Sequence, residues 1–248
     1  MRAAAALVLL ALAGCAAGPA PGEGGNDRSA AAYTGLGIAY LREGKLEQAL
    51  DRLQRAIAAD PGNATAHSAL GVVYERMGRE AEADRHYRRA VELAPEDPNA
   101  LNNLGRFLCA RGGREEAMRL FERAASAPGY GAPWVAWTNA GLCALAGGDR
   151  AGAEARLRRA LQLNPRFAPA LLPMVGVSLE RGRALSARGY LQRYHEVAPP
   201  SAESLWLGVQ VEQALGDRDA AARYASRLRS RFPDSPQARA LEAAEEGS

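Results

Sequence analysis

The sequence is poor in the residue types on which most catalytic and metal sites depend. Its 248 residues include three histidines, three cysteines and one lysine. It contains no HExxH, CxxC, GxSxG or Walker pattern, the motifs that would indicate a zinc site, a dithiol, a serine hydrolase or a nucleotide-binding loop. We therefore expect no enzymatic activity, no cofactor and no metal site, and we interpret His67, His86 and His195 as structural or solvated residues.

A strong excess of charge of one sign is also absent. The formal net charge is +3 on a chain that is 24% charged, and the basic residues are almost all arginines. Nucleic-acid-binding domains depend on a clustered basic surface that neutralises phosphates. The composition gives no indication of such a surface, so we expect no nucleic-acid partner.

The N-terminus carries a targeting signal. Arg2 precedes the apolar run 3–13, which is too short to cross a bilayer as a permanent helix. The sequence Leu-Ala-Gly-Cys at 12–15 matches the bacterial lipobox, in which the cysteine receives a diacylglycerol thioether. We expect a signal peptide at 1–14, a covalent lipid on Cys15 and a flexible Gly/Pro/Ala-rich tether over 15–29. The alternative is an ordinary secretory signal that ends beside a free cysteine.

Downstream of the tether, three residue types recur with a period of about 34. The phase is kept throughout, apart from two extra residues between Gly112 and Gly148. The prolines of this series are Pro61, Pro95, Pro165, Pro199 and Pro233. The glycines are Gly44, Gly78, Gly112, Gly148, Gly182 and Gly216, and the alanines are Ala49, Ala83, Ala117, Ala153, Ala187 and Ala221.

Each series has a mechanical reason in a helical hairpin. Proline ends the second helix, glycine adopts the left-handed conformation that ends the first, and alanine lets the two helices cross closely. With Leu36-Gly37 and Leu70-Gly71, the pattern resembles the tetratricopeptide repeat. This predicts an all-α, right-handed superhelix with a capping helix and tail over 236–248. We place its six units at 30–63, 64–97, 98–133, 134–167, 168–201 and 202–235.

In such repeats the first helices line a concave face that binds other proteins. Repeat positions 2, 5, 9, 12 and 13 predict a groove with apolar ends and a polar middle, which would accept an amphipathic helix or a short extended segment. An alternative for any single leucine is packing against the next unit. The candidate groove residues are Thr34, Ile38, Leu41, Ser68, Val72, Asn102, Arg106, Leu142 and Leu145.

Lipidation of Cys15 would leave Cys109 and Cys143 as an even pair in an exported protein. They stand at positions 12 and 10 of first helices in adjacent units, close enough for a bridge if the two-residue insertion shifts one helix against the other. We predict a disulfide here; the alternative is two buried free thiols.

The segments Asn-Asn-Leu-Gly-Arg-Phe-Leu-Cys at 102–109 and Trp-Thr-Asn-Ala-Gly-Leu-Cys at 137–143 resemble the PilF/PilW family of type IV pilus biogenesis lipoproteins. An asparagine at 103, where the family pattern leads us to expect an aromatic residue, departs from it. The resemblance implies a monomeric outer-membrane pilotin, facing the periplasm, that helps the pilus secretin to reach the outer membrane and multimerise. Alternative functions are an adaptor of another envelope machine, such as the tight-adherence pilus, and a regulator of a cell-wall enzyme.

Overall fold

A computed structural model describes residues 23–246 and is helical throughout this range, which confirms the predicted all-α tetratricopeptide superhelix. The six pairs and the closing helix are α1 (Glu23–Arg42), α2 (Leu46–Ala59), α3 (Ala64–Arg76), α4 (Glu80–Leu93), α5 (Pro98–Ala110), α6 (Arg114–Ser126), α7 (Pro133–Ala146), α8 (Arg150–Leu163), α9 (Ala168–Glu180), α10 (Ala184–Val197), α11 (Ala202–Ala214), α12 (Arg218–Arg231) and α13 (Pro236–Glu246).

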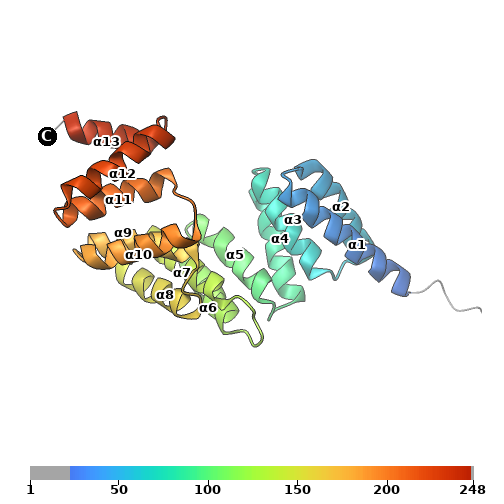
Figure 1. Ribbon diagram of the computed structural model, residues 1–248. Helices are drawn as coiled ribbons and strands as arrows, with labels where there is room; N and C mark the ends of the chain where they lie inside the picture. The colour runs from blue at the N-terminus through green and yellow to red at the C-terminus, as the bar shows by residue number, and fades with distance from the viewer. Residues whose placement is uncertain (1–22, 247–248) are drawn as a thin grey trace, which may run out of the picture.

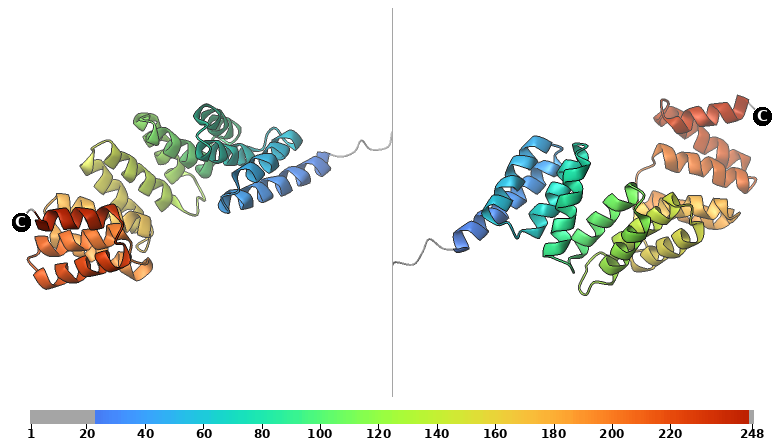
Figure 2. Two further views of the ribbon diagram at one scale, coloured as in Figure 1. Left: turned by 90° about the horizontal axis from the view of Figure 1, so that it is seen from above. Right: turned by 180° about the vertical axis from the view of Figure 1, so that it is seen from behind.

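The helical pairs stack in chain order, so that α1 and α13 lie at opposite ends of the molecule (Figure 1, Figure 2). Each first helix contacts the first helix of the next unit, from α1 and α3 through α9 and α11. Within the described range, the second helices of neighbouring units make no comparable contact with one another. The first helices are therefore crowded on the inner face of the superhelix and the second helices are spread on its outer face.

Glycine and proline end the helices as the sequence predicted. Six turns between paired helices contain one glycine of positive φ each, at 44, 78, 112, 148, 182 and 216, with φ between 68° and 85°. In the five units with a proline in the series, that residue lies two positions after the end of the second helix, as Pro95 does after Leu93. The backbone thus reverses where the residue types favour reversal.

In all units except the fifth, a bulky side chain of the second helix fills a space left by a glycine of the first helix. A Cβ placed on Gly71 would come within 2.6 Å of the Tyr87 ring, and one on Gly105 within 2.8 Å of Phe121. Tyr87 and Phe121 are both almost fully buried. This interlocking explains why a glycine of the first helix and a bulky residue of the second helix recur together in the repeat.

The helix boundaries differ from the predicted units in two places. Helix α7 begins at Pro133, one residue before the predicted unit, because proline is favoured in the first turn of a helix. Helix α1 begins at Glu23, so the flexible tether predicted over 15–29 is wrong for residues 23–29. Extending an existing helix costs less than nucleating one, which accounts for the longer α1. The predicted signal peptide and Cys15 lie outside the described residues.

The structure contains the predicted disulfide between Cys109 near the end of α5 and Cys143 near the end of α7. Their α-carbons are 5.9 Å apart, within the usual range for a bridge. The bond connects the third and fourth units across the two-residue insertion. Over residues 23–246, no helix is both long enough and apolar enough to cross a membrane.

Candidate protein-binding groove

The first three units enclose a hollow of about 450 Å³ on the first-helix side of the superhelix. Four predicted groove residues line it: Ile38 and Leu41 from α1, and Ser68 and Val72 from α3. The hollow lies within the roughly 300–1,000 Å³ of typical ligand pockets. The apolar side chains come from α1 and α3, and polar ones come from all three walls, which gives the hollow the mixed lining that a short peptide segment requires. The other lining residues are Arg42, Thr65, Ala69, Asp97, Asn99 and Asn103.

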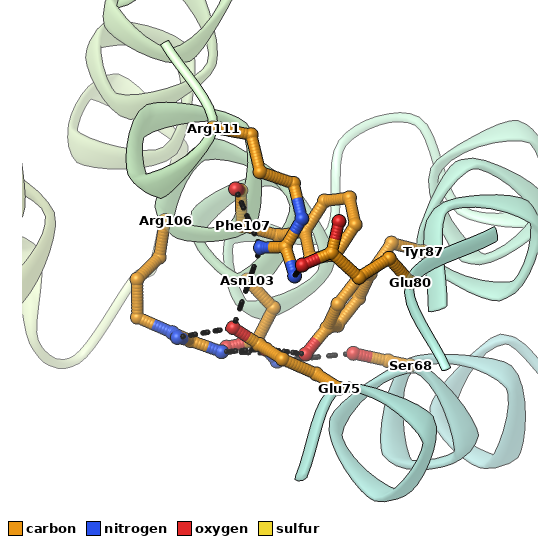
Figure 3. A network of polar contacts seen from close by, with 8 residues as sticks. All are labelled: Ser68, Glu75, Glu80, Tyr87, Asn103, Arg106, Phe107 and Arg111. Atoms are coloured by element: carbon orange, nitrogen blue, oxygen red, sulfur yellow. Dashed lines mark hydrogen bonds and ion pairs between the residues drawn. The ribbon is translucent and has the colours of Figure 1, made fainter. Parts of the chain in front are cut away.

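The asparagines of this hollow are Asn99 and Asn103, and the prediction that Asn102 offers its amide to a ligand is wrong. Asn102 is 8% exposed, and its oxygen accepts a hydrogen bond of 2.9 Å from Asn139 of the next unit. Asn103 reaches the other way and donates a 3.0 Å hydrogen bond to Ser68 (Figure 3). Consecutive residues on a helix point about 100° apart, so one asparagine faces the following unit and its neighbour faces the groove.

This pair of hydrogen bonds forms a ladder between first helices. In each rung, an asparagine reaches back to a polar residue on the preceding first helix: Asn103 to Ser68, and Asn139 to Asn102. The unusual asparagine at 103 is therefore part of inter-unit packing as well as of the hollow. Buried polar groups that are paired in this way fix the register of adjacent units.

Arg106, predicted as a groove residue, belongs to a polar network beside the hollow (Figure 3). Its guanidinium donates hydrogen bonds of 3.1 and 2.6 Å to the Glu75 carboxylate, which also accepts a 2.8 Å bond from Tyr87. Arg111 lies 3.8 Å from Glu75 and forms a 3.0 Å ion pair with Glu80. Arg106 is therefore a structural bridge between α3 and α5 rather than a free cation awaiting a ligand.

The charges in this network are mutually stabilised. Burial by itself would raise the pKa of Glu75, but hydrogen bonds from Arg106 and Tyr87 and the charges of Arg106 and Arg111 hold that pKa below its ordinary value. Burial and the hydrogen bond to Glu75 raise the pKa of the Tyr87 hydroxyl. Glu75 therefore stays ionised and Tyr87 protonated at neutral pH.

The remaining predicted groove residues lie outside the hollow. Thr34 is 6% exposed, and its hydroxyl donates to the carbonyl of Ala30 and accepts from Asn63. On α7, Leu142 is 39% exposed, while Leu145 packs into a separate core cluster with Trp137. The sequence predicted one groove with apolar ends and a polar middle. In the structure, these residues are divided among a hollow at the N-terminal end, a network of paired charges, and the two leucines of α7.

Sequence reasoning missed several residues of the hollow. Asp97 was recognisable as the cap before Pro98, and the structure shows its carboxylate accepting a 3.0 Å hydrogen bond from the backbone N–H of Asn99. Arg42 lies in the last turn of α1. Both residues bring charge to the rim. Arg42 stands at repeat position 13, which the repeat pattern places on the concave face, although it was not among the candidate groove residues, whereas Asp97 is the last residue of its unit and lies outside that pattern.

Comparisons with known proteins agree with this architecture. Models described as TPR repeat or tetratricopeptide repeat match residues 37–78, 64–97, 99–127 and 204–235. The type IV pilus assembly protein PilF of Pseudomonas aeruginosa is 31% identical over 233 residues, which cover 92% of this chain and 92% of PilF.

Two solved structures resemble the whole superhelix. The structure of Pseudomonas aeruginosa PilF has a TM-score of 0.81 at 31% identity, covering 89% of this chain and 99% of that one. The crystal structure of PilW, a widely conserved type IV pilus biogenesis factor, has a TM-score of 0.78 at 30% identity, covering 86% of this chain and 97% of PilW. The chain belongs to the tetratricopeptide-repeat family of type IV pilus biogenesis proteins represented by PilF and PilW.

Proposed function

We propose that this protein is a lipid-anchored pilotin of type IV pilus assembly, which binds a segment of the secretin in the hollow between α1, α3 and α5. Binding would promote delivery of the secretin to the outer membrane and its multimerisation. The observation that carries the proposal is the meeting of Ile38, Leu41 and Val72 with two asparagine side chains in one hollow. The relatives' roles in pilus assembly and biogenesis support it.

The chemistry of the hollow suits a short protein segment. Ile38 and Val72 are half-buried, so they leave apolar surface for an incoming side chain. Asn99 is exposed at the rim, and a primary amide both donates to and accepts from a peptide backbone. The residues that hold the units together next to the hollow, such as Arg106 and Glu75, already bind each other.

Two substitutions on the same helix test the proposal. Ile38→Asp puts a carboxylate into the hollow, whereas Leu36→Asp puts one at a leucine that is 49% exposed and does not line it. In a strain lacking the native gene, we expect Ile38→Asp to abolish most heat-resistant secretin multimers in membrane fractions, because an unpaired charge against apolar groups is strongly unfavourable. Leu36→Asp should support normal levels. If both variants are equally abundant and equally active, the secretin does not bind in this hollow.

Anchoring is tested separately, at Cys15. The lipobox predicts that Cys15→Ser remains an unlipidated precursor, because its thiol is the nucleophile that receives the lipid. Radiolabelled palmitate should label the native chain and leave Cys15→Ser unlabelled, and the variant should leave the outer-membrane fraction. Continued labelling and outer-membrane fractionation of Cys15→Ser would refute the lipoprotein assignment.

A further inference from the structure

Charge is distributed unevenly along the superhelix. Residues 150–231, from α8 to the end of α12, contain 14 arginines against 7 acidic residues, a net charge of +7. Residues 30–149 contain 14 basic and 15 acidic residues, a net charge of −1. A low overall charge therefore conceals a basic C-terminal half, and such asymmetry is typical of a surface that meets an anionic partner.

The basic half has a hollow on the second-helix side, between α10 and α12. It measures about 370 Å³, and Arg188, Tyr224, Arg223 and Arg227 are among its lining residues. The buried Glu212 also lines it, and both carboxylate oxygens of Glu212 are bound by Arg188. The charge of the Glu212 carboxylate is therefore neutralised by Arg188, which lines the same hollow.

The two arginines at the rim differ from Arg188. Arg223 and Arg227 stand one turn apart on α12, and both are exposed. Asp217 also lines the hollow, 3.7 Å from Arg188. Within the described part of the chain, neither Arg223 nor Arg227 forms an ion pair, so neither guanidinium has a carboxylate in direct contact.

An internal comparison shows what these arginines lack. The same two repeat positions in the third unit are Arg119 and Arg123, and each has a carboxylate partner. Arg119 pairs with Glu115 at 2.6 Å, and Arg123 with Glu96 at 3.3 Å. The last unit keeps the arginines, but Pro200 replaces the equivalent of Glu96, and Asp219, at the repeat position of Glu115, forms no ion pair with Arg223 within the described residues. A carboxylate supplied by another protein would complete the arrangement already present in the third unit.

We propose that the outer face of the last two units, centred on Arg223 and Arg227, is a second interaction surface that binds an acidic segment of a protein partner. A membrane surface fits this face less well, because no large hydrophobic residue of α12 is exposed for insertion between lipids, and the exposed Leu185 of α10 does not line the hollow. A concave site with two adjacent guanidinium groups is suited to side-chain carboxylates. This surface lies on second helices, so the segment would bind independently of any ligand in the first-helix hollow.

The second unit supplies a matched control. Arg85 and Arg89 occupy the same repeat positions on α4 as Arg223 and Arg227 do on α12, and both are exposed. Fluorescence anisotropy of a fluorescein-labelled hexaglutamate peptide would measure binding to the full chain purified in neutral detergent. We expect Arg223→Glu with Arg227→Glu to weaken binding at least about tenfold, equivalent to about 1.4 kcal/mol. Arg85→Glu with Arg89→Glu makes the same change in net charge and should leave the affinity within about twofold.

Equal losses in the two double variants would reduce the effect to net charge and overturn the proposal, as would no measurable binding by the native chain. Circular dichroism checks that each variant folds, and Arg223→Gln with Arg227→Gln repeats the test without charge reversal. Glycerophosphoglycerol, the headgroup of phosphatidylglycerol, serves as competitor at equal total negative charge. Displacement of the peptide by this headgroup would assign the surface to lipid instead of protein.

The pKa of His195, measured by NMR, tests whether the peptide binds at Arg227. It stacks on Tyr224 with ring centroids 6.2 Å apart, and burial, followed by the charge of Arg227, lowers its pKa. A carboxylate bound to Arg227 offsets that charge, so saturation with the peptide should raise the pKa of His195 in an NMR titration. An unchanged His195 titration in the presence of tightly bound peptide would place the peptide elsewhere and refute the assigned site.

Discussion

Tyr87 on α4 donates a 2.8 Å hydrogen bond to the Glu75 carboxylate on α3, and Arg106 of the following unit binds the same carboxylate. The Glu75 side chain is 18% exposed. A single carboxylate therefore joins both helices of the second unit to the first helix of the third. Nearest-neighbour contacts of this kind determine the stability of a repeat protein.

Replacing Glu75 by alanine should destabilise the protein by about 1–3 kcal/mol, because Arg106 and the partly buried Tyr87 hydroxyl lose their shared partner. Glu115→Ala is the matched control. Its carboxylate is 90% exposed and pairs with Arg119 within one helix, a type of pair that contributes about 0–1 kcal/mol. Urea unfolding followed by circular dichroism measures both changes. Equal losses in the two variants would contradict a structural role for the network.

Gly71→Ala should destabilise the protein by about 1–3 kcal/mol through overpacking. The new methyl group would come within 2.6 Å of Tyr87, a ring that is almost fully buried and held by its neighbours. Gly176→Ala makes the same chemical change inside helix α9, where nothing lies within 4 Å of the added Cβ.

The control should be neutral or stabilising by up to about 1 kcal/mol, because alanine favours helix over glycine. Thermal and urea unfolding of both variants give the comparison. A stabilised Gly71→Ala would show that the Leu-Gly positions have no steric requirement.

The repeat frame could be predicted from the sequence because each of its signals is local. Gly78 and Pro95 act on the backbone of their own turn, so their effect does not depend on distant residues. The groove could not be predicted to the same detail. Whether Asn102 or Asn103 faces the hollow depends on the rotation of α5 relative to both neighbouring first helices, which the 34-residue pattern does not encode.

The charged hollow of the last unit was also hidden from sequence reasoning. The net charge of the whole chain is +3, and this single value does not show that residues 150–231 are basic while residues 30–149 are nearly neutral. Arg119 and Arg223 look equivalent in the repeat. Only the folded structure shows that Glu115 binds Arg119 and that no carboxylate of residues 23–246 forms an ion pair with Arg223. Tertiary neighbours decide which members of a repeated series stay available to a partner.

Stability should fall as the pH decreases from about 6.5 toward 4, with His86 as a main contributor. Burial, the neighbouring His67 and the charge of Arg85 lower the pKa of His86 to about 4, while Glu82 opposes the shift. His86 Nδ1 lies 3.0 Å from His67 Nδ1, and its ring stacks on Tyr74. An unfolded histidine titrates near pH 6.5, so between that pH and 4 the unfolded chain binds more protons and is favoured by acid.

Because His86 is half-exposed, solvent screening limits the effect to about 1–2 kcal/mol. Urea unfolding at pH 7 and pH 4.5 should show a smaller loss of stability for His86→Gln than for the native protein. His67 and His195 also have lowered pKa values, so part of the pH dependence should persist in this variant. An identical pH dependence in the variant and the native protein would exclude the contribution of His86.

Removal of the Cys109–Cys143 disulfide should reduce the free energy of unfolding by about 3–4 kcal/mol. Without the bond, the loop of 34 residues is no longer closed in the unfolded chain, which gains conformational entropy. The bond joins α5 to α7, and the two-residue insertion lies between these helices, so its loss should open the middle of the superhelix before either end. Cys109→Ser with Cys143→Ser leaves both hydroxyls at the position of the bond and avoids free thiols. Urea unfolding gives the free-energy change, and hydrogen exchange should show faster exchange in α5 to α7 than in α3 or α11.

Non-reducing mass spectrometry of the native protein exported to the periplasm provides the direct check. Alkylation of both thiols in the folded, exported protein would contradict the bridge, and equal stabilities of the double variant and the native chain would contradict its energetic role.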